Sequence, residues 1–264
     1  MKLGTVQIVP LLACLIILQS PASEAADNDP KITLSMGTEF TSGTYGGDVD
    51  IEDTYVPITA MVDYGNVGFR LTVPYLSVDA PEGTVFDSGG EPLPGSGAMI
   101  TESGLGDVIG SVTFFDVISI QRLGLAVDLT GKIKFATADE DKGLGTGEND
   151  YTLQTDFYKF VDQFTWLGSV GYKFRGDPTG IDLDNVLMAS LGGTYKFTPD
   201  VNAGFFFDYR ESAISGSDSI REFSGFVSRR LSEDWKIQVY ALTGLTNSSP
   251  DWGAGLQIKR ILWQ

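Results

Sequence analysis

The sequence lacks histidine altogether, and its only cysteine is Cys14. Catalytic triads and zinc sites are mostly built from imidazole or thiolate side chains. The absence of both therefore excludes most hydrolase mechanisms, and we expect a protein that is not an enzyme. No cofactor-binding or metal-binding residues stand out in the sequence.

Long apolar runs are also missing after the N-terminal segment, and so is an excess of basic residues. The chain has 18 Lys and Arg residues against 35 Asp and Glu residues, a net charge of -17. Nucleic acid is a poor candidate partner because phosphate binding needs a basic surface. A membrane-spanning helix needs about 18 or more apolar residues. If the mature chain crosses a membrane, it must do so as a closed β-barrel.

The N-terminus has the pattern of a secretory signal peptide. Lys2 precedes an apolar stretch from Val6 to Leu18, and the small residues around Ser23–Ala26 form a cleavage site. We expect cleavage after Ala25 or Ala26, which gives a signal peptide at residues 1–25 and one domain at residues 26–264. Cys14 follows a short sequence similar to a lipoprotein cleavage box, but it is embedded in the apolar stretch itself.

From Lys31 onward, segments of about ten residues alternate between apolar and polar side chains. In the clearest one, Leu123 to Phe135, one face carries Leu125, Val127, Leu129 and Ile133 and the other face carries charges. Alternation with a period of two predicts a strand with one apolar face.

The same reading gives twelve strands whose connections alternate between short and long. This alternation is typical of an outer-membrane barrel, and an even count places both termini on the short-turn, periplasmic side. We therefore predict an all-β fold, a single transmembrane antiparallel meander β-barrel of about twelve strands. The predicted strands begin near Lys31, Asp53, Val67, Gly106, Leu123, Tyr151, Thr165, Asn185, Val201, Ile220, Trp235 and Trp252.

Aromatic residues gather at both ends of the predicted strands. Trp166, Tyr195 and Trp235 lie near the short turns, whereas Tyr75 and Tyr209 lie near the long loops. Two aromatic belts flank the apolar band of a membrane barrel. Alternation alone also fits a soluble β-sandwich or a lipocalin-like barrel, but the signal peptide, the loop asymmetry and the belts favour the membrane.

If the apolar faces contact lipid, the other faces line a lumen in which basic residues outnumber acidic ones. Such a lumen could bind or pass anions, or its charges could pair across strands and plug a narrow barrel. Both interpretations stay open. The candidate lumen and selectivity residues are Arg70, Asp128, Lys132, Lys134, Asp156, Lys173, Lys196, Asp208, Arg210, Glu222, Arg230 and Lys236, with Glu39 and Lys259 on the same faces.

The predicted long loops carry two acidic clusters, Asp48–Asp53 and Asp139–Asp150. Carboxylate oxygens suit calcium or magnesium, but the spacing fits no EF-hand, and acidic loops commonly keep a surface soluble. These loops could also bridge to lipopolysaccharide through divalent cations. The longest loop, Asp79 to Leu105, is long enough to be a constriction or a cover over the barrel mouth.

Three glycine-containing segments resemble a known family. They are Ser103–Val108, Lys142–Tyr151 and Ser249–Leu256, and the resemblance covers the chain from about Lys31 onward. The chain is similar to outer-membrane transporters associated with the meta pathway of phenol degradation. This resemblance implies an outer-membrane barrel that admits small, often aromatic, compounds. Such barrels usually end on an aromatic residue, whereas Trp263 is followed here by Gln264.

Together these features predict a channel or transporter in the Gram-negative outer membrane for small molecules, including aromatic or anionic compounds. The expected partners are outer-membrane lipid and lipopolysaccharide, a small-molecule solute, and the barrel-assembly machinery during biogenesis. The alternative is a non-channel barrel, structural or adhesive, with a plugged lumen and functional extracellular loops.

Overall fold

A computed structural model describes residues 29–86, 92–93 and 95–264 of the chain. The predicted signal peptide and its cleavage site lie outside these described residues. Within the described part of the chain, no helix is long and apolar enough to span a membrane.

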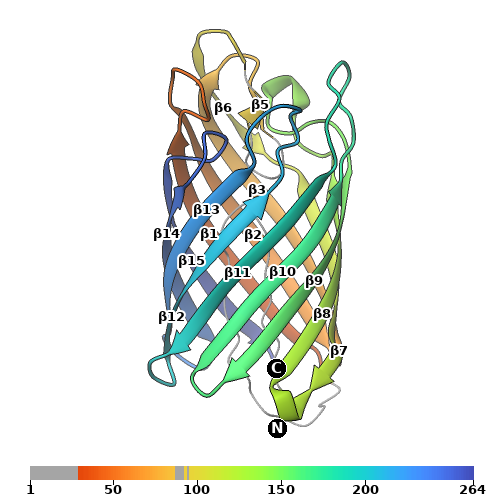
Figure 1. Cartoon of the computed structure of the whole chain (residues 1–264), viewed down its shortest axis with the longest axis vertical. Helices are drawn as coiled ribbons and strands as arrows, with labels where there is room; N and C mark the ends of the chain where they lie inside the picture. The colour runs from red at the N-terminus through yellow and green to blue at the C-terminus, as the bar shows by residue number, and fades with distance from the viewer. Residues whose placement is uncertain (1–28, 87–91, 94) are drawn as a thin grey trace.

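Twelve long antiparallel strands close into a barrel, as Figure 1 shows. Each strand pairs with its neighbours in sequence, and β15 returns to pair with β1. The predicted all-β meander barrel of about twelve strands is confirmed. The strands are β1 (Lys31–Gly43), β2 (Ile51–Tyr64), β3 (Val67–Pro81), β7 (Val108–Ile120), β8 (Leu125–Phe135), β9 (Asp150–Val161), β10 (Phe164–Phe174), β11 (Val186–Lys196), β12 (Val201–Arg210), β13 (Ile220–Arg230), β14 (Trp235–Gly244) and β15 (Trp252–Trp263).

The predicted long loop from Asp79 to Leu105 contains more regular structure than the sequence suggested. β3 continues beyond the start of β7, and β6 (Met99–Leu105) pairs with this upper part of β3. β4 (Val85–Phe86) and β5 (Pro92–Leu93) form a small hairpin of their own. This segment is therefore an extension of the barrel wall joined to a compact hairpin.

The prediction that β8 starts at Leu123 is wrong by two residues. A 3-10 helix, η1 (Gln121–Leu123), occupies this position and ends at Gly124 in the left-handed region, with φ 59°. Leu123 therefore belongs to the turn, and the strand starts at Leu125. A second 3-10 helix, η2 (Glu140–Lys142), lies in the β8–β9 connection.

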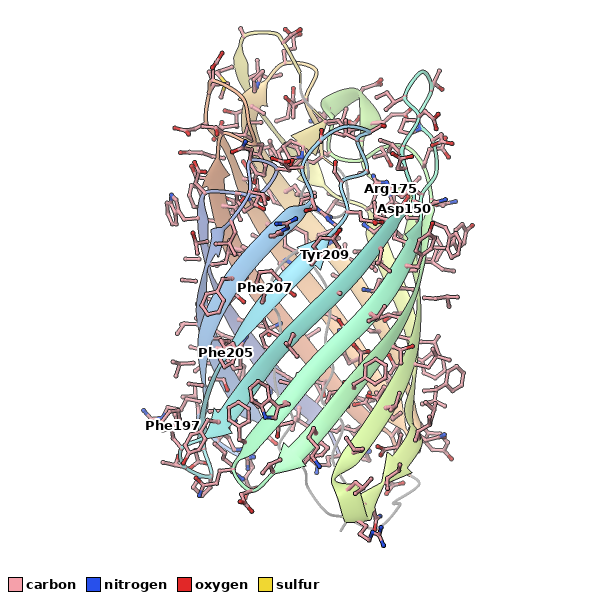
Figure 2. All side chains as sticks on the ribbon, viewed as in Figure 1. Asp150, Arg175, Phe197, Phe205, Phe207 and Tyr209 are labelled. Carbon is pink, nitrogen blue, oxygen red and sulfur yellow. The ribbon has the colours of Figure 1, made fainter. Side chains whose placement is uncertain are left out.

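The distribution of side chains is the reverse of that in a soluble protein. Outward-facing Leu153 and Leu191 are 59% and 58% exposed, whereas inward-facing Gln238 and Asp128 are only 0% and 1% exposed. A large continuous apolar exterior marks a membrane-contacting surface. Figure 2 shows Phe205, Phe207 and Tyr209 following β12 from the short-turn end toward the long-loop end. The apolar faces therefore form the outside of the barrel.

Candidate functional site

The candidate residues all lie on the inward-facing side of their strands. They alternate with exposed apolar residues, and many are fully enclosed; Arg210, for example, is 2% exposed. Strand register arranges them in oblique cross-strand rows, in which each member is the direct partner of the next. Because directly opposed residues have Cβ atoms about 4.5–5.5 Å apart, these rows define the local charge of the interior wall.

A basic row crosses β3, β7, β8, β9 and β10. Arg70 pairs with Ser111, which pairs with Lys132. The row continues through Thr152 to Lys173. Lys132 interacts electrostatically with both Lys173 and Arg70. Three cations are therefore separated only by small hydroxyl side chains.

An acidic row runs beside it toward β13. Asp128 pairs with Asp156, and at the far end Asp208 pairs with Glu222. Two serines connect these pairs, since Asp156 is the partner of Ser169 and Asp208 the partner of Ser190. The Ser169 and Ser190 hydroxyl oxygens are hydrogen-bonded at 2.7 Å. Glu222 also interacts electrostatically with the Arg210 guanidinium. The interior wall thus carries a basic and an acidic row side by side, and Lys132 and Arg70 of the basic row interact electrostatically with Asp156 of the acidic row.

A third row begins at the short-turn end and rises around the barrel. It starts with three consecutive cations, since Arg230 pairs with Lys236, which pairs with Lys259. It then passes through polar and apolar partners and reaches Lys134 at the long-loop end. The members between Lys259 and Lys134 are Ser35, Thr59, Thr72 and Ile109. Lys196 lies outside these three rows, at the end of β11 opposite Asn202.

Lys134 is enclosed between two carboxylates at the long-loop end. Its ammonium nitrogen lies 3.1 Å from Asp107 and 3.4 Å from Asp150, with all three side chains at most 5% exposed. It also donates a hydrogen bond to the Thr146 hydroxyl at 2.8 Å. Asp107 in turn accepts hydrogen bonds from the backbone N–H groups of Thr137 and Ala138. The cluster joins the β6–β7 junction to the β8–β9 connection.

Aromatic side chains fill part of the interior beside the charged rows. Phe206 and Phe226 stack with ring centroids 6.0 Å apart. A Cβ at Gly192 would come within 2.3 Å of the Phe206 ring, so only glycine leaves room for this ring against the wall. The Tyr240 hydroxyl donates a 2.5 Å hydrogen bond to Glu39. The interior therefore combines aromatic and charged surface.

Apolar residues from several connections pack together at the long-loop end. Leu93, Leu183 and Ala213 come from three different connections and are buried together with Val186 and Met188 of β11. Phe86 and Leu144 join the interior cluster from two loops. A cavity of about 210 Å³ lies beside this packing, lined in part by Tyr45, Ile51 and Ile214. Apolar contacts among three connections, here called the apolar cover, therefore lie at the long-loop end.

Sequence reasoning did not find Asp107, Thr146 or the pairing of Lys134 with Asp150. The alternation places Lys134 inside, but Asp107 sits in a strand break and Thr146 in an irregular loop. Asp150 was assigned to an acidic surface cluster, whereas the structure buries its side chain. The signal that could have found the cluster is an inward lysine one residue before the end of a strand.

Comparisons with known proteins agree with this architecture. The family model described as "Putative MetA-pathway of phenol degradation" matches residues 27–259. The crystal structure of an outer-membrane channel from Pseudomonas putida F1 matches with a TM-score of 0.71 and 14% identity, covering 93% of this chain and 100% of that chain. The KdgM porin matches with a TM-score of 0.55 and 9% identity, covering 86% and 98% respectively. No curated protein sequence matches the chain.

Proposed function

The chain belongs to the family of outer-membrane barrels associated with phenol degradation, and on this basis we propose that it is a channel through which small molecules cross the outer membrane. We propose that anionic and aromatic compounds are its preferred solutes. We assign it no enzymatic role, since the chain contains no histidine and its one cysteine lies in the predicted signal peptide.

The observation that carries the proposal is the charged interior wall inside an apolar exterior. A plugged barrel would pair its interior charges across strands, so a row of like charges is the feature of this wall that favours a pore. Here the basic row of Arg70, Lys132 and Lys173 lines the wall together with rings such as Phe206. Rings of basic side chains confer anion preference on pores.

The proposed orientation follows the general architecture of bacterial barrels. Short turns face the periplasm and long loops face the exterior. Both ends of the barrel sheet, the start of β1 and the end of β15, would then lie in the periplasm (Figure 1). The acidic long loops would contact lipopolysaccharide, and the barrel-assembly machinery would insert the chain into the membrane.

Planar-bilayer recording of the refolded protein under a salt gradient tests the proposal. We expect discrete conductance steps with a preference for anions. Arg70→Gln and Lys132→Gln should each shift the reversal potential toward cations. Arg221→Gln is the matched control, because Arg221 is an exposed arginine on the outer face of β13 near the Tyr209 ring. Equal shifts from all three variants would contradict the assignment of the basic row.

A second candidate is a barrel that does not conduct and acts through its loops. The apolar packing of Leu93, Leu183 and Ala213 across the long-loop end favours this reading. It predicts a silent bilayer from protein whose folding is verified by heat-modifiable gel mobility. Deletion of residues 82–98 should then abolish adhesion of cells that display the protein, although the barrel still folds. That result would identify the loops as the active part.

A further inference from the structure

Four basic side chains gather inside the short-turn end of the barrel. Arg230, Lys236 and Lys259 are consecutive partners on β13, β14 and β15. Lys31, the first residue of β1, lies four residues before Ser35, the partner of Lys259, and interacts electrostatically with Lys259. All four lie on the inward-facing side of their strands. They come from the C-terminal strands and from the first strand, so only closure of the barrel brings them together.

The four cations interact electrostatically with one another, and Lys259 also interacts with Arg70 of the basic row. Lys236 interacts with Arg230, and Lys259 interacts with Lys236. Lys31 interacts with both Lys259 and Arg230. Asp63, the cross-strand partner of Lys31, is the acidic group that interacts with Lys31 and Lys259. We call Lys31, Arg230, Lys236 and Lys259 the cation ring.

Strand pairing places three of these cations directly opposite one another. Like charges placed directly opposite each other on neighbouring strands destabilise a sheet. The same strands carry other basic residues on the outside, where the pattern differs. Outside the barrel, the Arg260 guanidinium lies 5.1 Å from the centroid of the Trp235 ring. Its neighbour in sequence, Lys259, is buried and faces inward with the other members of the cation ring. Direct pairing of cations therefore occurs on the inner surface, whereas the outer Arg229 and Arg260 have Ile237 and Trp235 as their partners on β14.

We propose that the cation ring is a binding site for a small multivalent oxyanion, such as a phosphate-type anion or a polycarboxylate. Neighbouring strands are about 4.8 Å apart, so the three-strand row presents its charges over a width of roughly 10 Å. Several oxygens of one anion can contact this surface at once, and the Arg230 guanidinium offers a bidentate geometry. A monatomic ion such as chloride cannot make several such contacts at once. The site deepens the proposed channel function and rests on it for its role, as the point where an anionic solute pauses at the periplasmic mouth.

Isothermal titration calorimetry of the full-length mature protein with inorganic pyrophosphate tests the site. The protein is held in an uncharged, lipid-free detergent, so that binding reports a soluble anion and not a lipid headgroup. We expect saturable binding of one pyrophosphate per barrel that weakens steeply with added sodium chloride. Lys236→Gln and Lys259→Gln should each weaken binding about tenfold, in line with the loss of one charge-assisted hydrogen bond.

Matched controls lie beside the ring on the opposite face of the wall. Arg229→Gln and Arg260→Gln remove the same charge one residue away, outside the barrel, and should leave pyrophosphate binding unchanged. Heat-modifiable gel mobility shows that each variant is folded. Absence of binding, or equal weakening by the inner and outer variants, overturns the proposal.

The outcome is separable from that of the channel test. Pyrophosphate binding in a barrel that is silent in bilayers would keep the site and refute conduction. Conductance steps without pyrophosphate binding would keep the channel and refute the site. If pyrophosphate binds only after anionic phospholipid is removed by washing, the ring is a headgroup site, and the proposal of a soluble ligand fails.

Discussion

Lys134 and Lys236 belong to the same cross-strand row but lie near its opposite ends, and their surroundings differ. Lys134 sits between Asp107 and Asp150, and its ammonium donates a hydrogen bond to the Thr146 hydroxyl. Lys236 is flanked in the row by Arg230 and Lys259. One end of the row thus balances its lysine with negative charge, whereas the other end accumulates positive charge.

The contrast separates two uses of an inward-facing lysine in one barrel. A lysine enclosed by two carboxylates balances their negative charge and holds together the segments of chain that carry them. The Asp107 and Asp150 side chains also accept backbone hydrogen bonds from Thr137, Ala138 and Gly176. Lys134 therefore acts as a structural clamp on the loops. A lysine directly opposite other cations adds repulsion to the sheet, and the proposed oxyanion would offset that repulsion.

The largest expected effect is that of Lys134→Met. Removing one partner of a buried ion pair leaves uncompensated charge, which costs about 3–5 kcal/mol. Here the variant leaves two buried carboxylates, so we expect a clear fall in the midpoint of guanidinium unfolding in lipid vesicles. We also expect faster proteolysis within the β8–β9 connection, because Thr146 loses its hydrogen-bond donor.

The control for this variant is Lys142→Met in the β8–β9 connection. Lys142 lies 4.0 Å from Glu102, and its side chain is 46% exposed. Exposed pairs contribute only about 0–1 kcal/mol, so this variant should unfold close to the parent protein. Similar unfolding midpoints for the two variants would show that the Lys134 cluster is not a clamp.

The second effect concerns the apolar cover at the long-loop end. Leu183→Ala should loosen the contact among loops, since shortening a buried leucine to alanine costs about 2–5 kcal/mol where packing cannot relax. A looser cover should raise the open probability of the channel severalfold in single-channel recordings. Ion preference should not change, because the charged rows stay intact.

Ile181→Ala provides the comparison within the same loop. Ile181 is 41% exposed, two residues before Leu183, which is 6% exposed. We expect the Ile181 variant to conduct like the parent protein. An equal rise in open probability for both variants would indicate that general loop mobility, not the buried cover, limits conduction.

The strands could be predicted from the sequence because the signal is repeated along each of them. The alternation in β8, for example, places Val127 and Leu129 outside and Asp128 and Lys132 inside. Turn residues such as Gly65 mark where pairs of strands reverse. The β3 extension that pairs with β6 escaped prediction, since Pro81 and the surrounding glycines look like loop chemistry.

The charged rows could not be predicted, although their members could. Alternation predicts that Lys236 and Lys259 face inward, but only the strand register shows that they are direct partners. Register depends on the exact turn lengths and on bulges, such as the irregularity between Phe114 and Ile118, and a small slip changes every pairing. The same limit hid the Lys134 cluster, which needs Asp107 from a strand break.

The smallest expected effect has the opposite sign to that of the Lys134 variant and depends on salt. Lys236→Gln removes the middle charge of three paired cations and keeps a hydrogen-bonding side chain of similar length. Because directly opposed like charges destabilise a sheet, this variant should be slightly more stable than the parent protein in dilute buffer. At 1 M salt the screening length falls to about 3 Å, and the gain should vanish. Arg260→Gln, which removes a charge stacked on Trp235, should instead be slightly destabilising. If Lys236→Gln lowers the unfolding midpoint at both salt concentrations, the lysine stabilises the barrel as Lys134 does, and the distinction between the two ends of the row is lost.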